Sequence, residues 1–386
     1  MRTALLGGVL LVLGGVAVVT GLLPLPETVE LFDRVWPILL FVIAMTVVTE
    51  LAAEAGVFDL LARWATGWAG GRAWVLWILV LALATLSTVF LSLDTTAVLL
   101  TPIVVLVARK AGLAVMPFAL TTVWIANTGS LLLPVSNLTN LLAEHELPGF
   151  SPAEFAALMA VPALVAVVVP AIVLFLVFRR DLMARFQPAP AHPIEDRPLL
   201  IASSLVLAAV IPFLVLGIPV WIPACVAALA LIVLFAVRRR SVLRFGLLPW
   251  QLVLLASGLF LVVEAAHPLG LESVAQAIAG TGRDLGSLLQ LSGSAALSAN
   301  LIDNLPAYLA LEPVAGDPVR VGALLIGVNA GALITPWASL ATLLWHRRLR
   351  AMEVEISWWR YAALGAIAAP LTVVLATVGL WATHPS

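Results

Sequence analysis

Long stretches of this chain carry no charged residue, and they restrict its possible folds more than any other feature. The runs at 4–23, 199–212 and 221–237 contain no Asp, Glu, Lys or Arg. A membrane-spanning helix needs roughly 20 apolar residues. Over all 386 residues, 62% are hydrophobic and 11% are charged, whereas a soluble domain carries about 25% charged residues. We therefore predict an all-α, polytopic membrane protein.

The net charge and the few cysteines and histidines limit the ligands and partners that the chain can bind. The net charge of −1 leaves no basic surface for nucleic acid. A single cysteine, Cys225, excludes a disulfide framework and a cysteine metal cluster, and the scattered histidines lack ligand spacing, so we expect neither metal nor cofactor. The first apolar run is too long for the apolar region of a signal peptide and is expected to stay as a helix. We expect a multi-pass protein of the inner (plasma) membrane, surrounded by lipid.

The chain is an internal duplication. "VWPILLFVIAMTVVTELAAEAG" (35–56) aligns with "PWQLVLLASGLFLVVEAAHPLG" (249–270), which places Glu50 on Glu264. "LDTTAVLLTP" (93–102) then matches "DNLPAYLALEP" (303–313), and "IANTGSLLLPVSN" (125–137) matches "GVNAGALITPWAS" (327–339). Three matches in the same order, with an offset that shrinks along the chain, are typical of a duplication followed by small deletions.

Basic residues predict the orientation of the two copies, because cytoplasmic loops collect Arg and Lys. Clusters occur at 63–72, 109–110, 179–197, 238–244 and 347–350. Placing all of them inside makes the two halves run in opposite directions, the inverted repeats of many secondary transporters. We expect an N-terminal membrane repeat (1–178), a cytoplasmic linker (179–197) and a C-terminal membrane repeat with an extra connecting helix (198–386). Arg34, Arg283 and Arg320 fall outside as exceptions.

The third repeated pair places Asn, Gly and Pro inside membrane segments, where they disfavour regular helix. Irregular backbone at that depth is tolerated where it lines a cavity or is buried in protein. We therefore expect breaks at 127–130 and 329–332, and two discontinuous helices whose ends form a substrate site; two kinked helices without a ligand are the alternative. The predicted substrate-binding residues are Asn127, Thr128, Gly129, Ser130, Ser136, Asn137, Asn300, Asn304, Asn329, Gly331, Thr335 and Ser339.

The segments 73–108 and 286–312 are interpreted as re-entrant hairpins, each with an acid near its centre. Asp94 and Asp303 are the main proton-coupling candidates, since a carboxylate in a membrane interior is costly unless it is paired, hydrated or protonated. Asp94 in an external loop between two full spans is the alternative. The repeated Glu50 and Glu264 are further coupling candidates, or solvated residues at helix ends.

The chain contains no P-loop or nucleophile elbow, so we expect no enzyme. The stretches "LDTTAVLLTPIVVLVARKAGL", "FALTTVWIANTGSLLLPVSNLTNLL" and "ITPWASLATLLWHRRLRAMEVEISWWRY" resemble the ArsB arsenite/antimonite permeases of the ion transporter superfamily. The resemblance implies export of trivalent arsenite or antimonite, by proton antiport or with a separate ATPase subunit. It also implies two inverted repeats, each with a re-entrant hairpin and a broken helix. In those permeases the positions of Asn127 and Asn329 are often Asp.

Substrate chemistry leaves two transport readings open. Arsenite near neutral pH is mainly uncharged As(OH)3, which suits the neutral donors and acceptors of Asn, Ser and Thr. A di- or tricarboxylate, or another small anion, could instead be held by amide donors and helix N-termini. The absence of basic residues from the predicted core argues against the second reading.

Overall fold

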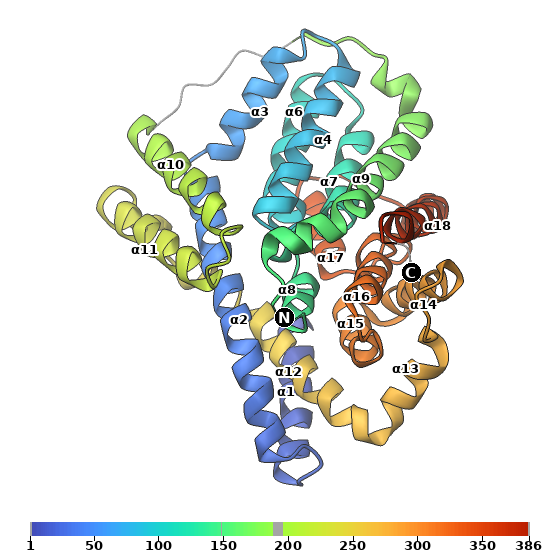
Figure 1. Cartoon of the computed structure of the whole chain (residues 1–386). Coiled ribbons are helices and arrows are strands. Elements are labelled where there is room, and N and C mark those ends of the chain that lie inside the picture. Colours follow the sequence, from blue (N-terminus) through green and yellow to red (C-terminus); the bar gives the residue numbers. More distant parts are fainter. Residues whose placement is uncertain (1, 148, 188–195, 385–386) are drawn as a thin grey trace.

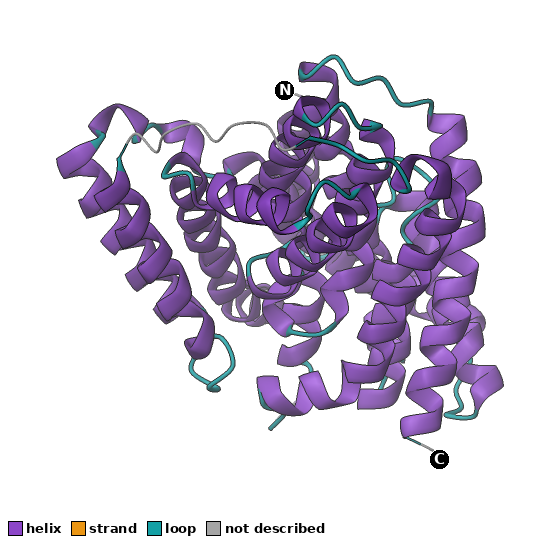
Figure 2. Ribbon diagram, turned by 90° about the horizontal axis from the view of Figure 1, so that it is seen from above, coloured by secondary structure: helices purple, strands orange, loops and turns teal. Residues whose placement is uncertain are grey.

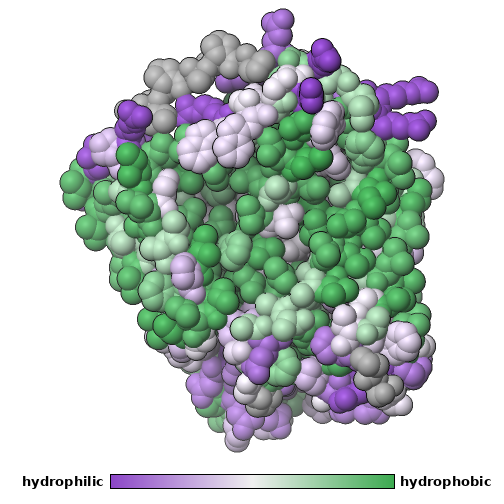
Figure 3. Space-filling view, turned by 45° about the horizontal axis from the view of Figure 1, so that its top comes forward, coloured by the Kyte–Doolittle hydropathy of each residue, from purple (hydrophilic) through white to green (hydrophobic). Residues whose placement is uncertain are grey.

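The computed structural model describes residues 2–147, 149–187 and 196–384 (Figure 1). All regular elements in these ranges are helical (Figure 2), apart from one isolated β-bridge between Arg72 and Arg185. Seven helices in the described part of the chain are long and apolar enough to cross a membrane. A broad apolar band separates two polar ends of the surface (Figure 3). These features confirm the predicted polytopic, all-α class.

The main helices of the two halves follow the same order, although the short helical segments between them differ. The first half comprises α2 (Leu25–Glu54), α3 (Val57–Trp68), α4 (Ala73–Phe90), α5 (Leu93–Thr95), η1 (Thr96–Leu100), α6 (Thr101–Lys110), α7 (Val115–Thr128), η2 (Gly129–Leu131), η3 (Pro134–Ser136), α8 (Leu138–His145) and α9 (Pro152–Leu182). The second comprises α12 (Trp250–Ala266), η6 (His267–Leu271), α13 (Glu272–Ala279), α14 (Leu285–Ile302), α15 (Asn304–Leu311), η7 (Glu312–Val314), α16 (Pro318–Leu325), η8 (Ile326–Ala330), α17 (Leu340–Ala351) and α18 (Trp358–Thr383). Each half is thus a long helix, a short helix, a hairpin, a broken helix and a closing helix.

The closing helices α9 and α18 pack antiparallel. At one end of the pair the guanidinium of Arg360 lies 5.6 Å from the ring centroid of Phe178. At the other end Gly379 is so close to Val161 that an added Cβ would lie 2.9 Å from its Cγ1. Because α9 and α18 are equivalent elements, the two halves run in opposite directions. The predicted inverted repeats are therefore confirmed.

The two hairpins enter the protein from opposite sides and meet inside it. The open end of α4–α6 lies beside α3, and the main-chain N–H of Ala73 bonds to Ala184 O (3.1 Å). The open end of α14–α15 lies beside α13 (Figure 1). Ser92 and Asp303 form the two tips and cap the helices that follow them. Asp303 has a φ of 102°, an uncommon conformation for a residue other than glycine.

Both broken helices are interrupted over more residues than the sequence predicted. Helix α7 ends at Thr128 and α8 begins at Leu138, so the interruption extends to Asn137. In the second half η8 ends at Ala330 and α17 begins at Leu340. Asn300 supplies partners for the second break: its Nδ2 donates to Gly331 O (2.8 Å), and its Oδ1 accepts from Ile334 N (3.1 Å) and Thr335 N (3.0 Å). Such pairing makes irregular backbone tolerable in the interior.

The three arginines that break the orientation rule are all engaged by neighbouring groups. Arg34 forms an ion pair with Glu312, and its Nε lies 3.3 Å from Glu146 Oε1. Arg283 Nε lies 3.0 Å from Asp317 Oδ2. Arg320 is buried and donates to main-chain oxygens at Gly280 (2.7 Å), Gly282 (2.8 Å), Val314 (3.1 Å) and Ala315 (2.9 Å). These contacts explain why the three arginines lie on the outer side, although the orientation rule places most basic residues in the cytoplasm.

In the described part of the chain, three α-helices stand outside the repeated pattern, as do the short 3-10 helices η4 (Arg240–Val242) and η5 (Phe245–Leu247). Helix α1 (Arg2–Val19) packs on α12, where Gly7 allows the backbones to touch: an added Cβ would lie 2.7 Å from Leu255 N. Helices α10 (Arg197–Phe213) and α11 (Trp221–Arg238) connect the halves and pack on α2. The domain boundaries stay a prediction, because residues 188–195 of the predicted linker lie outside the described residues.

Candidate functional site

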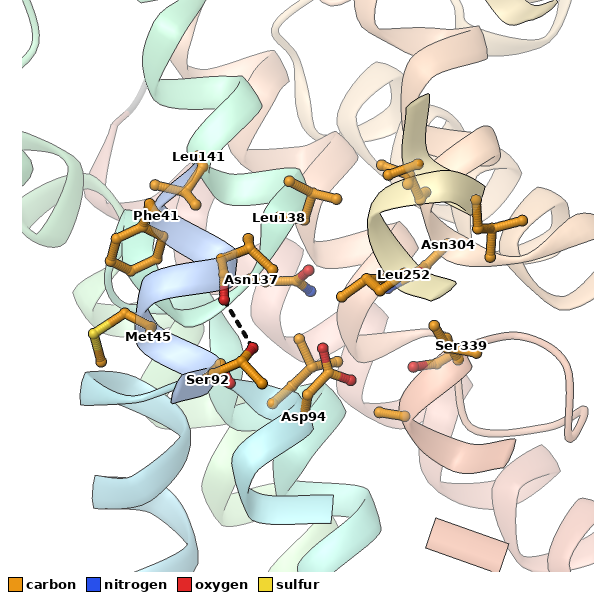
Figure 4. A pocket seen from close by; sticks show the side chains of 18 of the residues that line it. Phe41, Met45, Ser92, Asp94, Asn137, Leu138, Leu141, Leu252, Asn304 and Ser339 are labelled. Carbon is orange, nitrogen blue, oxygen red and sulfur yellow. Dashed lines mark hydrogen bonds between the residues drawn. The ribbon is translucent and has the colours of Figure 1, made fainter. Parts of the chain in front are cut away.

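A cavity of about 80 Å³ lies where the two hairpin tips meet the two broken helices (Figure 4). Since roughly 10–15 Å³ holds one water, the cavity has room for a small solute. Its polar side chains include Ser92, Asp94, Asn137, Asp303, Asn304 and Ser339. Its apolar walls come mainly from α2 and α12.

The cavity is lined by matching residues of the two repeats. In the alignment of 35–56 with 249–270, Phe41 corresponds to Leu255 and Met45 to Leu259, and all four line the cavity. Asn137 likewise corresponds to Ser339, and both line it. The cavity therefore lies on the pseudo-twofold axis that relates the halves.

Helix N-termini converge on this cavity. Helices α8, α15 and α17 begin directly after Asn137, Asp303 and Ser339, and the helical arm that runs from α5 to α6 begins after Ser92. The first N–H groups of a helix carry a positive partial charge. The cavity thus receives partial positive charge from the backbone of both halves.

The formal charges in the cavity are negative. Asp94 comes from the first hairpin and Asp303 from the second, and the two carboxyl groups are close enough to interact electrostatically. No Lys, Arg or His is among the described residues that line the cavity. The site therefore combines two acids with neutral hydrogen-bonding groups.

Asn127 and Asn329 lie behind the cavity rather than on its wall. Both are buried, at 1% and 0% exposure. Asn127 Nδ2 donates to Thr342 Oγ1 (3.4 Å), and Asn329 Nδ2 donates to Asn140 Oδ1 (3.0 Å). Positions 140 and 342 match in the repeats, as do 127 and 329, so these two bonds are equivalent. Each repeated asparagine thus binds the broken helix of the opposite half; we call this pair of contacts the crossed asparagine brace.

The Asn329 arm of the brace reaches the cavity through one residue. Asn329 Oδ1 accepts from Asn137 Nδ2 (2.8 Å) and Thr139 Oγ1 (3.1 Å). Asn140 Nδ2 in turn donates to Ser130 O (2.7 Å) and Leu133 O (3.0 Å), which directs its Oδ1 toward Asn329. Asn329 therefore positions Asn137, whose side chain lines the cavity.

Several other predicted site residues stabilise the breaks and do not line the cavity. Ser130 Oγ donates to Asn127 O (2.7 Å), Ser136 Oγ to Val89 O (2.9 Å) and Thr335 Oγ1 to Asn300 O (2.8 Å). Gly331 packs against α14, where an added Cβ would lie 2.4 Å from Ala296 Cβ. Thr128, Gly129 and Asn300 are buried within or beside the breaks. Of the predicted binding residues, the cavity brings together Asn137, Asn304 and Ser339.

The four acids predicted for proton coupling separate into two pairs. Asp94 and Asp303 face the same cavity, although they lie far apart in the sequence. Glu50 and Glu264 are half-buried and do not line it. Glu50 lies within electrostatic range of Arg244 and Arg348. Geometry therefore favours the first pair as groups that meet a solute.

The sequence prediction did not include Ser92 among the substrate-binding residues, and it missed the apolar wall of the cavity. Phe41 and Met45 project from α2, and Leu252 and Leu259 from α12. Apolar residues on these helices look alike whether they face lipid or a cavity. The alignment of 35–56 with 249–270 contains the one signal that could have found them, because the matching positions line the cavity together.

Comparison with known proteins relates the whole chain to membrane transporters. Residues 2–342 match the CitMHS family, described as citrate transporters. The arsenical pump membrane protein of Escherichia coli K12 is 31% identical over 95% of this chain and 89% of its own. The protein of that name from Yersinia enterocolitica is 30% identical over 91% and 87%. An uncharacterised transporter of Mycobacterium tuberculosis is 25% identical over 90% and 86%.

Among solved structures, the fold is similar to that of the YdaH transporter of Alcanivorax borkumensis, described as having an unusual topology. The TM-score is 0.59 at 16% identity, over 99% of this chain and 98% of the other. The comparison agrees with the helical membrane fold described above. The chain therefore belongs to the CitMHS family of membrane transporters, within the ion transporter superfamily, and is a multi-pass protein of the inner membrane.

Proposed function

We propose that this chain exports arsenite or antimonite from the cytoplasm through the central cavity, in exchange for protons. The relatives named as arsenical pump membrane proteins support the substrate class. The main structural support is the composition of the cavity wall. It contains two carboxyl groups and several neutral hydrogen-bonding side chains, with no cation among the described lining residues.

This wall suits an uncharged trihydroxide. Asn137, Asn304 and Ser339 can donate to and accept from the hydroxyls of As(OH)3. The Ser339 hydroxyl is buried and has no hydrogen-bond partner within the described chain, so a solute can supply one. Burying an oxyanion such as arsenate here would cost at least several kcal/mol, and helix N-termini would return only about 0.3–2 kcal/mol each. We therefore expect arsenate to be excluded.

Asp94 and Asp303 are proposed as the proton-coupling groups. One acid comes from each hairpin, and both meet at the same cavity. A proton on these groups removes charge from a cavity whose described lining residues include no cation, and its release toward the cytoplasm can accompany metalloid export. We assign Asn127 and Asn329 a positioning role through the crossed asparagine brace.

A second candidate is transport of a carboxylate, favoured by the helix N-termini that converge on the cavity and by the family description. Its difficulty is electrostatic. Citrate would place its own carboxylates beside Asp94 and Asp303 without a lysine or arginine from the lining residues to compensate. Such a substrate would bind only with both acids protonated.

Uptake into everted membrane vesicles tests both proposals. Vesicles that contain the chain receive a proton gradient and no ATP, and uptake of arsenite, antimonite, arsenate, citrate and succinate is compared. We expect arsenite and antimonite to accumulate, with coupling lost in Asp94→Asn and Asp303→Asn. Glu50→Gln and Glu264→Gln are the matched controls. Citrate uptake without arsenite uptake would establish the second candidate, and arsenite uptake that appears only with ATP would indicate a separate ATPase subunit.

A further inference from the structure

A second cavity, of about 570 Å³, opens on the surface between α7, α17 and α18. It shares no lining residue with the central cavity. Arg347 and Arg348 are exposed on α17 beside it, and the basic clusters place this end of the protein in the cytoplasm. The cavity therefore faces the cytoplasmic leaflet of the membrane.

Cationic groups predominate on the polar side of this cavity. Two arginines line it, Arg350 from α17 and Arg360 from α18, beside the imidazole of His346, whereas Glu355 is the single acid among the described lining residues. The described ion pairs include neither Arg350 nor Arg360. The Arg360 guanidinium lies over the Phe178 ring, a contact made through its face that leaves its in-plane N–H donors available. These donors match the geometry of a phosphate.

The remaining wall is apolar and aromatic. Met116 and Leu120 of α7 and Leu364 of α18 line it. Trp358 packs on His346 with ring centroids 4.3 Å apart, and the neighbouring Trp359 is 82% exposed. Exposed tryptophans next to arginines are typical of the interface between membrane and water. The cavity therefore has a polar side and an apolar side at the depth of the membrane interface, where the polar headgroup of a phospholipid joins its apolar acyl chains.

We propose that this cavity binds the phosphate headgroup of an anionic phospholipid from the cytoplasmic leaflet, with Arg350 and Arg360 holding the phosphate and Leu120 and Leu364 contacting the start of an acyl chain. The occupant would contact the cytoplasmic ends of both broken helices and of α18 at once. Its presence is thus expected to restrain α17, whose first residues line the central cavity.

Lipid retention by the purified protein tests the proposal. The protein is exchanged into detergent with equal amounts of phosphatidylglycerol and phosphatidylcholine, and bound lipid is counted by native mass spectrometry. We expect selective retention of phosphatidylglycerol, weakened roughly fivefold by each of Arg350→Gln and Arg360→Gln. Arg347→Gln, on the same helix but outside the cavity, is the matched control and should retain lipid like the parent. Glu355→Gln should retain more, a gain that misfolding cannot produce.

Three results would contradict binding of an anionic phospholipid in this cavity. Equal retention of the two lipids, or retention unchanged in the Arg350→Gln/Arg360→Gln variant, overturns the proposal. Inorganic phosphate is the second arm: if it displaces phosphatidylglycerol at millimolar concentration, the cavity is a site for free oxyanions and the lipid assignment is wrong. Binding is measured without transport, so the result does not depend on which solute the central cavity carries.

Discussion

The crossed asparagine brace leads to a prediction about unequal stability. Asn127 and Asn329 occupy matching positions, yet Asn329 makes three side-chain hydrogen bonds to the opposite half. Asn127 makes one long contact to that half, at 3.4 Å, and one bond to Val123 O in its own helix. Its Oδ1 is buried without a partner in the described chain. Replacing each asparagine by alanine should therefore have different consequences.

The magnitudes follow from these contacts. A hydrogen bond contributes about 0.5–1.5 kcal/mol to protein stability, and bonds between membrane helices average roughly 0.6 kcal/mol. We expect Asn329→Ala to lower the free energy of unfolding by about 2–4 kcal/mol, because it also leaves buried partners on Asn137 and Asn140 unpaired. Asn127→Ala should lower the free energy of unfolding by roughly 0.5–1 kcal/mol, since it removes only one long contact to the opposite half.

Reversible unfolding in mixed micelles, followed by tryptophan fluorescence, measures both losses. A double-mutant cycle between Asn329→Ala and Asn140→Ala should return a coupling of about 0.5–1.7 kcal/mol. Equal losses for the two single variants, or a larger loss for Asn127→Ala, would refute the reasoning, because the brace would then not act through the contacts seen.

Three further predictions concern other parts of the fold. Arg320→Met should lower the unfolding free energy by about 3 kcal/mol or more in the same assay, because buried carbonyls at Gly280 and Gly282 lose a charged donor; an unchanged midpoint would contradict this. Gly331→Ala should lower the unfolding free energy by about 1–3 kcal/mol in that assay, because the added Cβ overlaps with Ala296. Gly293→Ala should leave the unfolding free energy unchanged, because an added Cβ there meets open space. Hydrogen bonds from Arg238 and Leu199 N hold the pKa of Asp196 below its usual range. The stability that Asp196 contributes is thus present above its ordinary pKa and is lost as pH falls through the depressed value. The protection of amides at the start of α10, measured as the observed exchange rate relative to the intrinsic rate at the same pH, should therefore decrease on acidification, and Asp196→Asn should abolish that decrease.

The sequence was sufficient to predict the membrane class, the inverted repeats, the hairpins and the presence of both breaks. Each of these depends on a pattern along the chain: charge-free runs, repeated motifs, or Asn, Gly and Pro in apolar surroundings. The position of Asp94 and Asp303 near the hairpin centres was also predicted, and the structure adds that both line one cavity.

The direction of individual side chains did not follow from the sequence. Asn127 and Asn329 were expected to face a solute, but their neighbours come from the opposite half, and no local pattern specifies them. The walls formed by α2 and α12 were missed because an apolar residue packs equally well against lipid, protein or a cavity. Arg34, Arg283 and Arg320 contradicted the orientation rule because carboxylates and carbonyls distant in sequence engage them.

The crossed asparagine brace has a consequence for how the two halves must be arranged. The polar groups at the break of each half are completed by side chains of the other half, so a single half in a membrane would leave them unpaired. A single half could meet the same requirement by pairing with a second copy inserted in the opposite direction. Within one chain the connection between the halves fixes their opposite orientations, and the two asparagines need not bind the same number of partners.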